Sequence, residues 1–206
     1  NGQYEDIKSV FLTHHHHDHS TGLMDLNHLT IDSKRVTIHE EKHSKLESFL
    51  GNEYDIYMSN KCLSFVSQSK KYLFENDRLN FKTIDQGECI EINGIKIQAV
   101  STNHCDGYLS YIIKDENKKV FYHPDFGEIK NIDNINVDYS IIDASSATGC
   151  DIHTNIENFK QMNEKIESDV SIGTNISEHL LNKDTEVLSN RSSRYGIKIV
   201  NDGYKF

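Results

Sequence analysis

Short strand-like runs alternate with helix-like runs in the first quarter of the chain. Residues 8–13 predict a strand, and the helix that follows begins at Ser20 or Thr21, either of which can cap it. The elements expected before residue 80 are a strand at 8–13, a helix at 20–27, a strand at 36–39 and a helix at 40–50. Residues 51–79 have no clear period, so we interpret them as an insertion or an active-site loop.

Antiparallel hairpins are expected in the middle of the chain. Asn93-Gly94 lies between two strand-like runs and is a strong signal for a two-residue hairpin turn. The expected strands are 80–85, 88–92, 95–101, 108–114, 118–122, 137–143, 170–172 and 197–200, with helices at 155–166 and 183–188. Hairpins in the middle and strand–helix alternation at both ends favour a mixed α/β (α+β) fold in which helices pack outside the sheets. A length of 206 residues suits a single domain spanning 1–206.

Composition excludes several classes of partner. The chain carries 32 acidic and 22 basic residues, a formal charge of −10, and such a surface repels polyphosphate unless its basic residues are grouped. Nucleic acid is therefore not expected as a partner, and a small-molecule substrate is. No apolar stretch approaches the roughly 20 residues that span a bilayer, so no membrane partner is expected. The 4 cysteines show neither close pairing nor zinc-knuckle spacing, which predicts a reduced, cytoplasmic protein.

The strongest chemical signal is a cluster of metal-ligand residues directly after the first strand. It reads His14-x-His16-x-Asp18-His19 and continues into the expected helix. Four consecutive histidines also resemble a purification tag, but this run is internal and leads into an Asp-His pair rather than a linker. Neutral imidazoles and carboxylates are ligands that suit zinc, manganese or iron. We therefore interpret the cluster as half of a two-metal site.

Three further candidate ligands follow later strands. His104 comes after the strand at 95–101, Asp125 after the strand at 118–122, and His179 after the strand at 170–172. A lone histidine or aspartate of this kind is more often a solvated residue or a cap. Taken with the first cluster, the three predict a complete metal centre.

In these motifs and their order, the chain resembles the metallo-β-lactamase fold superfamily of metal hydrolases. The resemblance implies an αββα sandwich and a centre with two divalent metal ions, zinc foremost, with manganese or iron as alternatives. It implies that one ion is held by His14, His16 and His104, that the second is held by Asp18, His19 and a late histidine, and that Asp125 bridges both. The bridging aspartate and the closing segment 199–204 look most like the branch of tRNase Z and the cyclic phosphodiesterases.

The chain departs from that branch at the last ligand position and at the amino end, and it has one further candidate residue, His153. Where the branch has Thr-His-x-Ser, this chain has Asn175 in place of the histidine. Either His179 is the last ligand in a shifted loop, or the second metal ion is weakly bound or absent. We favour His179. His153 is a candidate for proton transfer or phosphate contact, or a plain neighbour of a helix cap. The superfamily has several strands before its first histidine motif and this chain has about a dozen residues there. We therefore expect the amino-terminal strands to be missing or shortened, with a second copy in a homodimer or a partner segment completing that sheet.

The resemblance leaves several functions open. The leading expectation is a dinuclear hydrolase in which a metal-bound hydroxide attacks a phosphodiester, small or cyclic, with Asp18 and His153 as catalytic residues. A thioester or lactone hydrolase is the first alternative, because the same centre attacks carbonyl groups. A catalytically degenerate metal-binding or partner-binding protein is the second. A tRNA-processing enzyme would need a basic exosite arm, which the sequence does not show.

Overall fold

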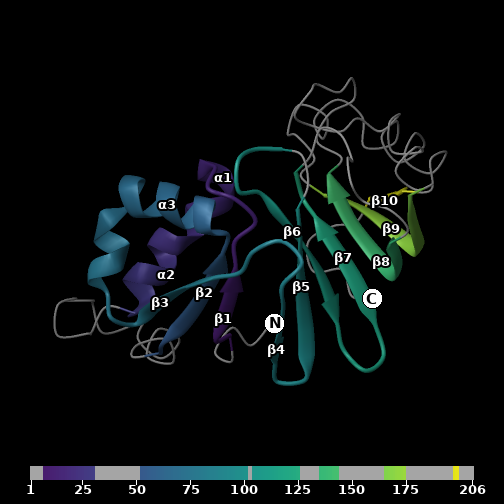
Figure 1. The fold of residues 1–206 in the computed structure, drawn as a ribbon, viewed down its shortest axis with the longest axis horizontal. Coiled ribbons are helices and arrows are strands. Elements are labelled where there is room, and N and C mark those ends of the chain that lie inside the picture. Colours follow the sequence, from purple (N-terminus) through teal and green to yellow (C-terminus); the bar gives the residue numbers. More distant parts are fainter. Residues whose placement is uncertain are drawn as a thin grey trace, which may run out of the picture. The chain divides into compact units, whose positions relative to one another are not determined.

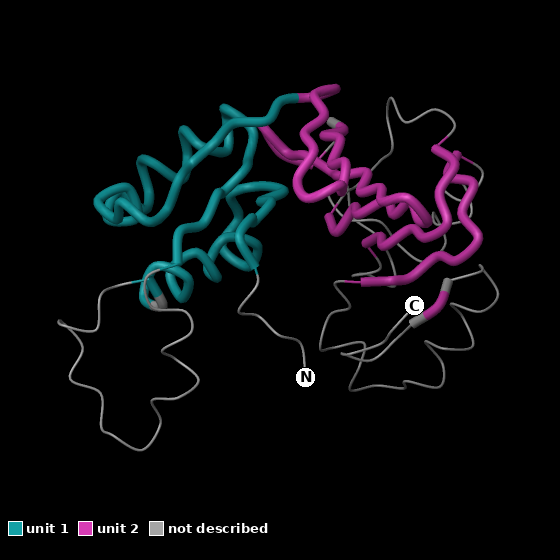
Figure 2. Tube along the Cα trace, turned by 90° about the horizontal axis from the view of Figure 1, so that it is seen from below, with its two compact units in different colours: residues 1–85 teal, residues 86–206 magenta. Residues whose placement is uncertain are grey.

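The computed structural model describes residues 7–30, 52–101, 104–125, 135–143, 165–174 and 197–199. The chain divides into two compact units, Asn1–Asp85 and Gln86–Phe206 (Figure 2). Each unit has its own sheet (Figure 1). The expectation of one domain over 1–206 stays a prediction.

The first unit is a parallel three-stranded sheet with helices packed on one face. The strands are β1 (Ser9–Phe11), β2 (Tyr54–Met58) and β3 (Leu79–Thr83), in the order β1-β2-β3, and the helices are α1 (His17–Ser20), α2 (Gly22–Thr30), α3 (Asn60–Ser69) and the 3-10 helix η4 (Lys71–Glu75). Helix and strand side chains share one buried core: Leu12, Leu23, Tyr54, Ile56, Met58, Cys62, Val66, Leu73 and Leu79. Burial of this apolar surface is what fixes the helices on the sheet.

The prediction that residues 51–79 form an insertion or an active-site loop is wrong for their described part. The described part, 52–79, forms the central strand β2 and two helical elements rather than a loop. Four of the five β2 residues are buried, so the strand lacks the simple alternation that marks a half-exposed strand. Helix α3 begins where the Ser59 hydroxyl accepts a hydrogen bond from the Cys62 backbone N–H at 3.1 Å.

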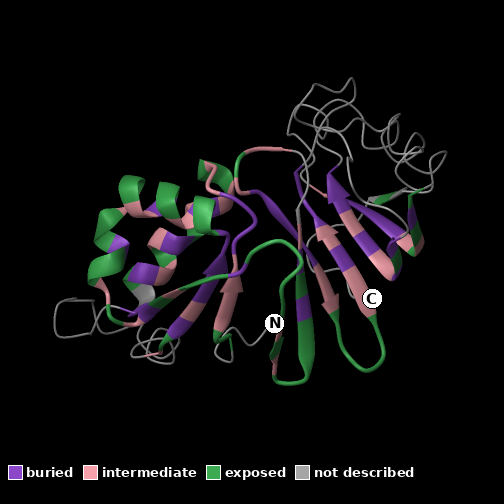
Figure 3. Ribbon diagram, viewed as in Figure 1, coloured by how far each residue is buried: buried purple, intermediate pink, exposed green. Residues whose placement is uncertain are grey.

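The second unit is a seven-stranded mixed sheet in the order β10-β9-β8-β7-β6-β5-β4. Its strands are β4 (Cys89–Ile92), β5 (Ile95–Ser101), β6 (Leu109–Lys114), β7 (Lys119–His123), β8 (Ile135–Asp143), β9 (Ile166–Thr174) and β10 (Ile197–Ile199). Strands β4 to β7 are antiparallel and include the hairpins that the sequence predicts. Strands β7 to β10 are parallel. Buried residues lie on β6, β7, β8 and β9, whereas β4 has none (Figure 3).

The hairpin predictions are confirmed. Asn93 and Gly94 both have positive φ, 52° and 81°, which is the backbone of the two-residue turn that this dipeptide favours. In the second hairpin the Asp115 carboxylate accepts backbone N–H bonds from Asn117 and Lys118 at 2.7 and 2.6 Å. These two bonds, the first foremost, lower the pKa of Asp115.

Two other expectations have different outcomes. The prediction of a helix at 155–166 is wrong at its end, because Ile166 is the first residue of β9, and residues 155–164 lie outside the described residues. The strand expected at 36–39 and the helices expected at 40–50 and 183–188 lie outside the described residues.

Candidate metal centre

The histidine cluster of the first unit starts where β1 ends. The Leu12 N–H donates to the Tyr57 carbonyl at 2.8 Å, which ties the chain to the central strand just before the cluster. Thr13 and His14 are both buried. The Thr13 hydroxyl lies 3.1 Å from His14 Nδ1, so this hydrogen bond orients the ring and leaves Nε2 for another partner.

The ring nitrogens of His14 and His16 converge. His14 Nε2 lies 3.0 Å from His16 Nδ1, and the two rings meet edge to face with centroids 4.5 Å apart. Two nitrogen ligands of one tetrahedral zinc ion lie about 3.3 Å apart, given zinc–nitrogen bonds of about 2.0–2.1 Å. The pair therefore has nearly the spacing that a shared metal ion requires.

Helix α1 brings Asp18 and His19 to the same place. The His19 ring lies beside the His14 ring with centroids 4.4 Å apart, and His19 Nε2 is 3.3 Å from an Asp18 carboxylate oxygen. The Asp18 side chain is 71% exposed while that of His19 is 16% exposed, so Asp18 approaches the cluster from the solvent side. All four members of the sequence motif thus gather within the first unit.

The second unit holds a buried histidine–carboxylate pair. His104 Nε2 lies 3.5 Å from Asp125 Oδ2, and the two side chains are only 1% and 2% exposed. A carboxylate this deeply buried is costly unless a cation or several hydrogen bonds compensate its charge. A divalent ion ligated by both groups meets that requirement, and the donor types fit zinc.

Around this pair lies a network that the sequence analysis missed. Tyr108, Ser110 and His123 are all buried. The Asp125 backbone N–H donates to the Tyr108 hydroxyl at 3.0 Å, and Ser110 Oγ is hydrogen-bonded to His123 Nδ1. In the sequence His123 stands two residues before Asp125 and Tyr108 begins the strand expected at 108–114, so no local pattern connects the two residues.

Burial dominates the electrostatics of this network. It lowers the pKa of His123 from 6.5 to about 3 and raises the pKa of Tyr108 well above 10.0. Burial likewise raises the pKa of the Cys105 thiol to about 11. In the metal-free protein these three groups are therefore neutral at physiological pH, and the Asp125 carboxylate is the negative charge that they surround.

Other candidate residues have different positions. His153, Asn175 and His179 lie outside the described residues, so their roles stay predictions. His17 is exposed, and His15 is half-buried with its ring stacked on Phe65 at 4.1 Å.

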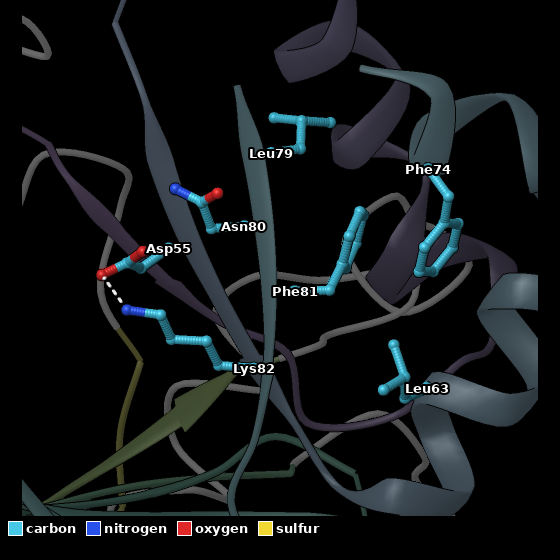
Figure 4. Close-up of a pocket in the computed structure, with 7 residues that line it drawn as sticks. All are labelled: Asp55, Leu63, Phe74, Leu79, Asn80, Phe81 and Lys82. Atoms are coloured by element: carbon cyan, nitrogen blue, oxygen red, sulfur yellow. Dashed lines mark hydrogen bonds and ion pairs between the residues drawn. The ribbon is translucent and has the colours of Figure 1, made fainter. Parts of the chain in front are cut away.

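The first unit also has an open pocket of about 540 Å³ beside β3 (Figure 4). The apolar side chains of Leu63, Phe74 and Phe81 lie on one side of the strand, and Asp55 and Lys82 lie on the other (Figure 4). The two charged residues of this lining form an ion pair at 2.7 Å. This lining is apolar on one side and carries an ion pair on the other, whereas the histidine cluster consists of metal-ligand side chains.

None of the helices in the described ranges has the length and apolarity needed to cross a membrane.

The chain is similar in sequence to one protein family and in structure to several solved proteins. The model of the beta-lactamase superfamily domain matches residues 1–172. A diphosphatase from the PhnP family is similar in structure, with a TM-score of 0.67 at 21% identity over 97% of this chain and 70% of its own. Zinc-bound PqqB from Methylobacterium extorquens has a TM-score of 0.66 at 16% identity, covering 96% of this chain and 70% of its own. The short form of human tRNase Z has a TM-score of 0.60 at 11% identity, covering 96% and 78%.

A search of curated proteins gives no significant sequence match. The family match, however, covers well over half of the chain, and the similar structures share its fold. The chain belongs to the metallo-β-lactamase fold superfamily.

Proposed function

We propose that this protein is a dinuclear metal-dependent hydrolase that cleaves a phosphodiester, small or cyclic. The observation that carries the proposal is the pair of ligand sets, one in each unit. His14, His16, Asp18 and His19 converge in the first unit, and His104 and Asp125 converge in the second. A diphosphatase and a tRNase among the similar structures favour phosphoryl chemistry over attack on a carbonyl.

In this proposal His14, His16 and His104 hold one ion, and Asp18, His19 and His179 hold the other, with Asp125 between them. Two bound ions would supply a nucleophile of lowered pKa and positive charge for the phosphoryl oxygens. Zinc is the first choice, as in the PqqB structure, and manganese or iron are the alternatives.

The chain's own residues orient these ligands. Thr13 fixes the ring of His14 through Nδ1, and the Tyr108 hydroxyl holds the backbone of Asp125. Asp18, largely exposed beside His19, is the ligand placed to meet an incoming substrate and to accept the proton that the attacking water loses. His153 is proposed to deliver a proton to the leaving oxygen or to contact the phosphate.

Acidic composition and cysteine usage support the remaining parts of the proposal. A net charge of −10 favours a small substrate over a nucleic acid. The cysteines of the described ranges, Cys62, Cys89 and Cys105, are not in disulfides, which suits a protein of the reducing cytoplasm.

The activity test compares substrate classes on the metal-loaded full chain. We expect turnover of bis(p-nitrophenyl) phosphate, and loss of that turnover in His14→Ala. The matched control is His28→Ala, because His28 is an exposed histidine on α2 outside the cluster. Turnover of only a thioester or a lactone would overturn the phosphodiesterase assignment, and turnover of none of the three would favour a protein that has lost catalysis.

The metal test is elemental analysis of the purified chain. We expect about two metal ions per chain, the number that two-metal hydrolases hold, and a lower number in His179→Ala. An unchanged stoichiometry in that variant would show that His179 is not the last ligand.

A further inference from the structure

Tyr108 is in contact with both members of the buried ligand pair of the second unit. Its ring meets the His104 ring edge to face, with centroids 5.3 Å apart and planes at 65°. Its hydroxyl accepts the Asp125 backbone N–H at 3.0 Å. One rigid side chain, only 2% exposed, therefore bridges the ring of one ligand and the backbone of the other.

The local backbone explains how a side chain so close to His104 in sequence can reach Asp125. Tyr108 ends a tight turn in which Gly107 has a φ of 79° and the Tyr108 N–H donates to the Cys105 carbonyl at 3.1 Å. The turn leads into β6, and β6 pairs with β7 in antiparallel register. Asp125 follows the end of β7, so the phenol ring points across the hairpin toward it.

The hydroxyl of Tyr108 gives the Asp125 amide a partner that the sheet does not provide. β7 ends at His123, so the Asp125 N–H lies beyond the strand. A buried amide of this kind needs an acceptor, and the phenol oxygen is that acceptor. The bond fixes the backbone from which the Asp125 carboxylate projects toward His104.

The Tyr108 ring has a second aromatic neighbour. The His123 ring lies 5.9 Å from it at 76°, and His123 is held in turn by Ser110 through Nδ1 and by stacking on Phe121 at 5.3 Å. Ser110 also interacts with the Tyr108 hydroxyl. The Tyr108 ring thus packs against the rings of both His123 and His104.

We propose that Tyr108 is a positioning residue: it sets the spacing and orientation of His104 and Asp125 so that both can bind one metal ion. The inference rests on the proposed metal centre and deepens it. Groups that orient metal ligands contribute to affinity even though they do not touch the metal. Removing the phenol oxygen leaves the ring contacts in place and takes away the hydroxyl's hydrogen bond with the Asp125 backbone and its interaction with Ser110.

The test compares Tyr108→Phe with Tyr111→Phe in the full chain. Tyr111 is the matched control, since it is a tyrosine of β6, the strand that begins directly after Tyr108, and is only 1% exposed. Zinc affinity is measured by competition with a chromophoric chelator, and ligand geometry by the visible absorption of the cobalt-substituted protein. We expect Tyr108→Phe to bind zinc about 10–100-fold more weakly, with a changed cobalt spectrum, and Tyr111→Phe to match the wild type in both.

Wild-type affinity and an unchanged cobalt spectrum in Tyr108→Phe would overturn the inference, and so would an equal loss in both variants. If Tyr108→Phe does not melt cooperatively, Ser110→Ala takes its place, because it removes the support of His123 and the side-chain contact with the Tyr108 hydroxyl while His104, Asp125 and Tyr108 themselves are unchanged. A loss of affinity with a changed spectrum is expected there too, and its absence would overturn the inference.

The two proposals can fail separately. A wild-type protein that binds metal but hydrolyses no phosphodiester refutes the proposed activity while the effect of Tyr108→Phe on affinity still stands. A wild-type protein that binds no metal refutes both.

Discussion

The buried His123 makes the stability of the metal-free protein dependent on pH. In the folded chain its pKa is lowered from 6.5 to about 3 by burial, so as the pH falls below 6.5 the unfolded chain takes up the proton and the folded chain does not. Stability is therefore complete above pH 6.5 and is lost progressively down to about pH 3. The loss is about 1.4 kcal/mol per pH unit, or about 2 kcal/mol at about pH 5.

The substitution His123→Leu tests this pH dependence, because leucine fills a similar volume with an apolar side chain that cannot titrate. Urea unfolding is followed by circular dichroism at several values between about pH 7.5 and 5, with a chelator present because bound metal would stabilise the folded state. Between these limits the wild type should lose about 2 kcal/mol more than His123→Leu.

Phe121→Leu is the matched control. Phe121 is fully buried on the same strand and stacks on His123, so the substitution weakens the core without removing a titrating group. It should lower the free energy of unfolding at every pH and keep the wild-type slope. Equal pH dependence of the wild type and His123→Leu would refute the account of His123 as a buried neutral group.

Three further outcomes follow from single contacts. Thr13→Val removes the hydroxyl that orients His14 through Nδ1 and should weaken zinc binding about 10-fold in chelator competition, without a comparable loss of melting temperature in the metal-free protein. Ser59→Ala removes the cap of α3 and should cost about 1 kcal/mol in urea unfolding, whereas Ser67→Ala on the exposed part of that helix should change it by less than about 0.5 kcal/mol. Leu73→Ala opens a cavity at a fully buried position and should cost about 2–5 kcal/mol; a smaller loss would indicate that the core collapses around the site.

Local patterns explain why much of the second unit could be predicted from the sequence. The turn at Asn93-Gly94 depends on the backbone preferences of two adjacent residues, and both adopt the positive φ expected of them. The strands on either side alternate in polarity, so their type could be recognised without knowing their partners. By contrast, β2 is buried along nearly its whole length, and only its place between β1 and β3 shows it to be a strand.

The sequence by itself determined the cluster of His14, His16, Asp18 and His19, because residues this close along the chain after a strand end must also be close in space. It could not determine the environment of Asp125. Ser110 and His123 are 13 residues apart in the chain, and only the antiparallel pairing of β6 with β7 brings them and Tyr108 together around that carboxylate. Such contacts depend on strand register and burial, which are properties of the assembled sheet rather than of any local run of residues.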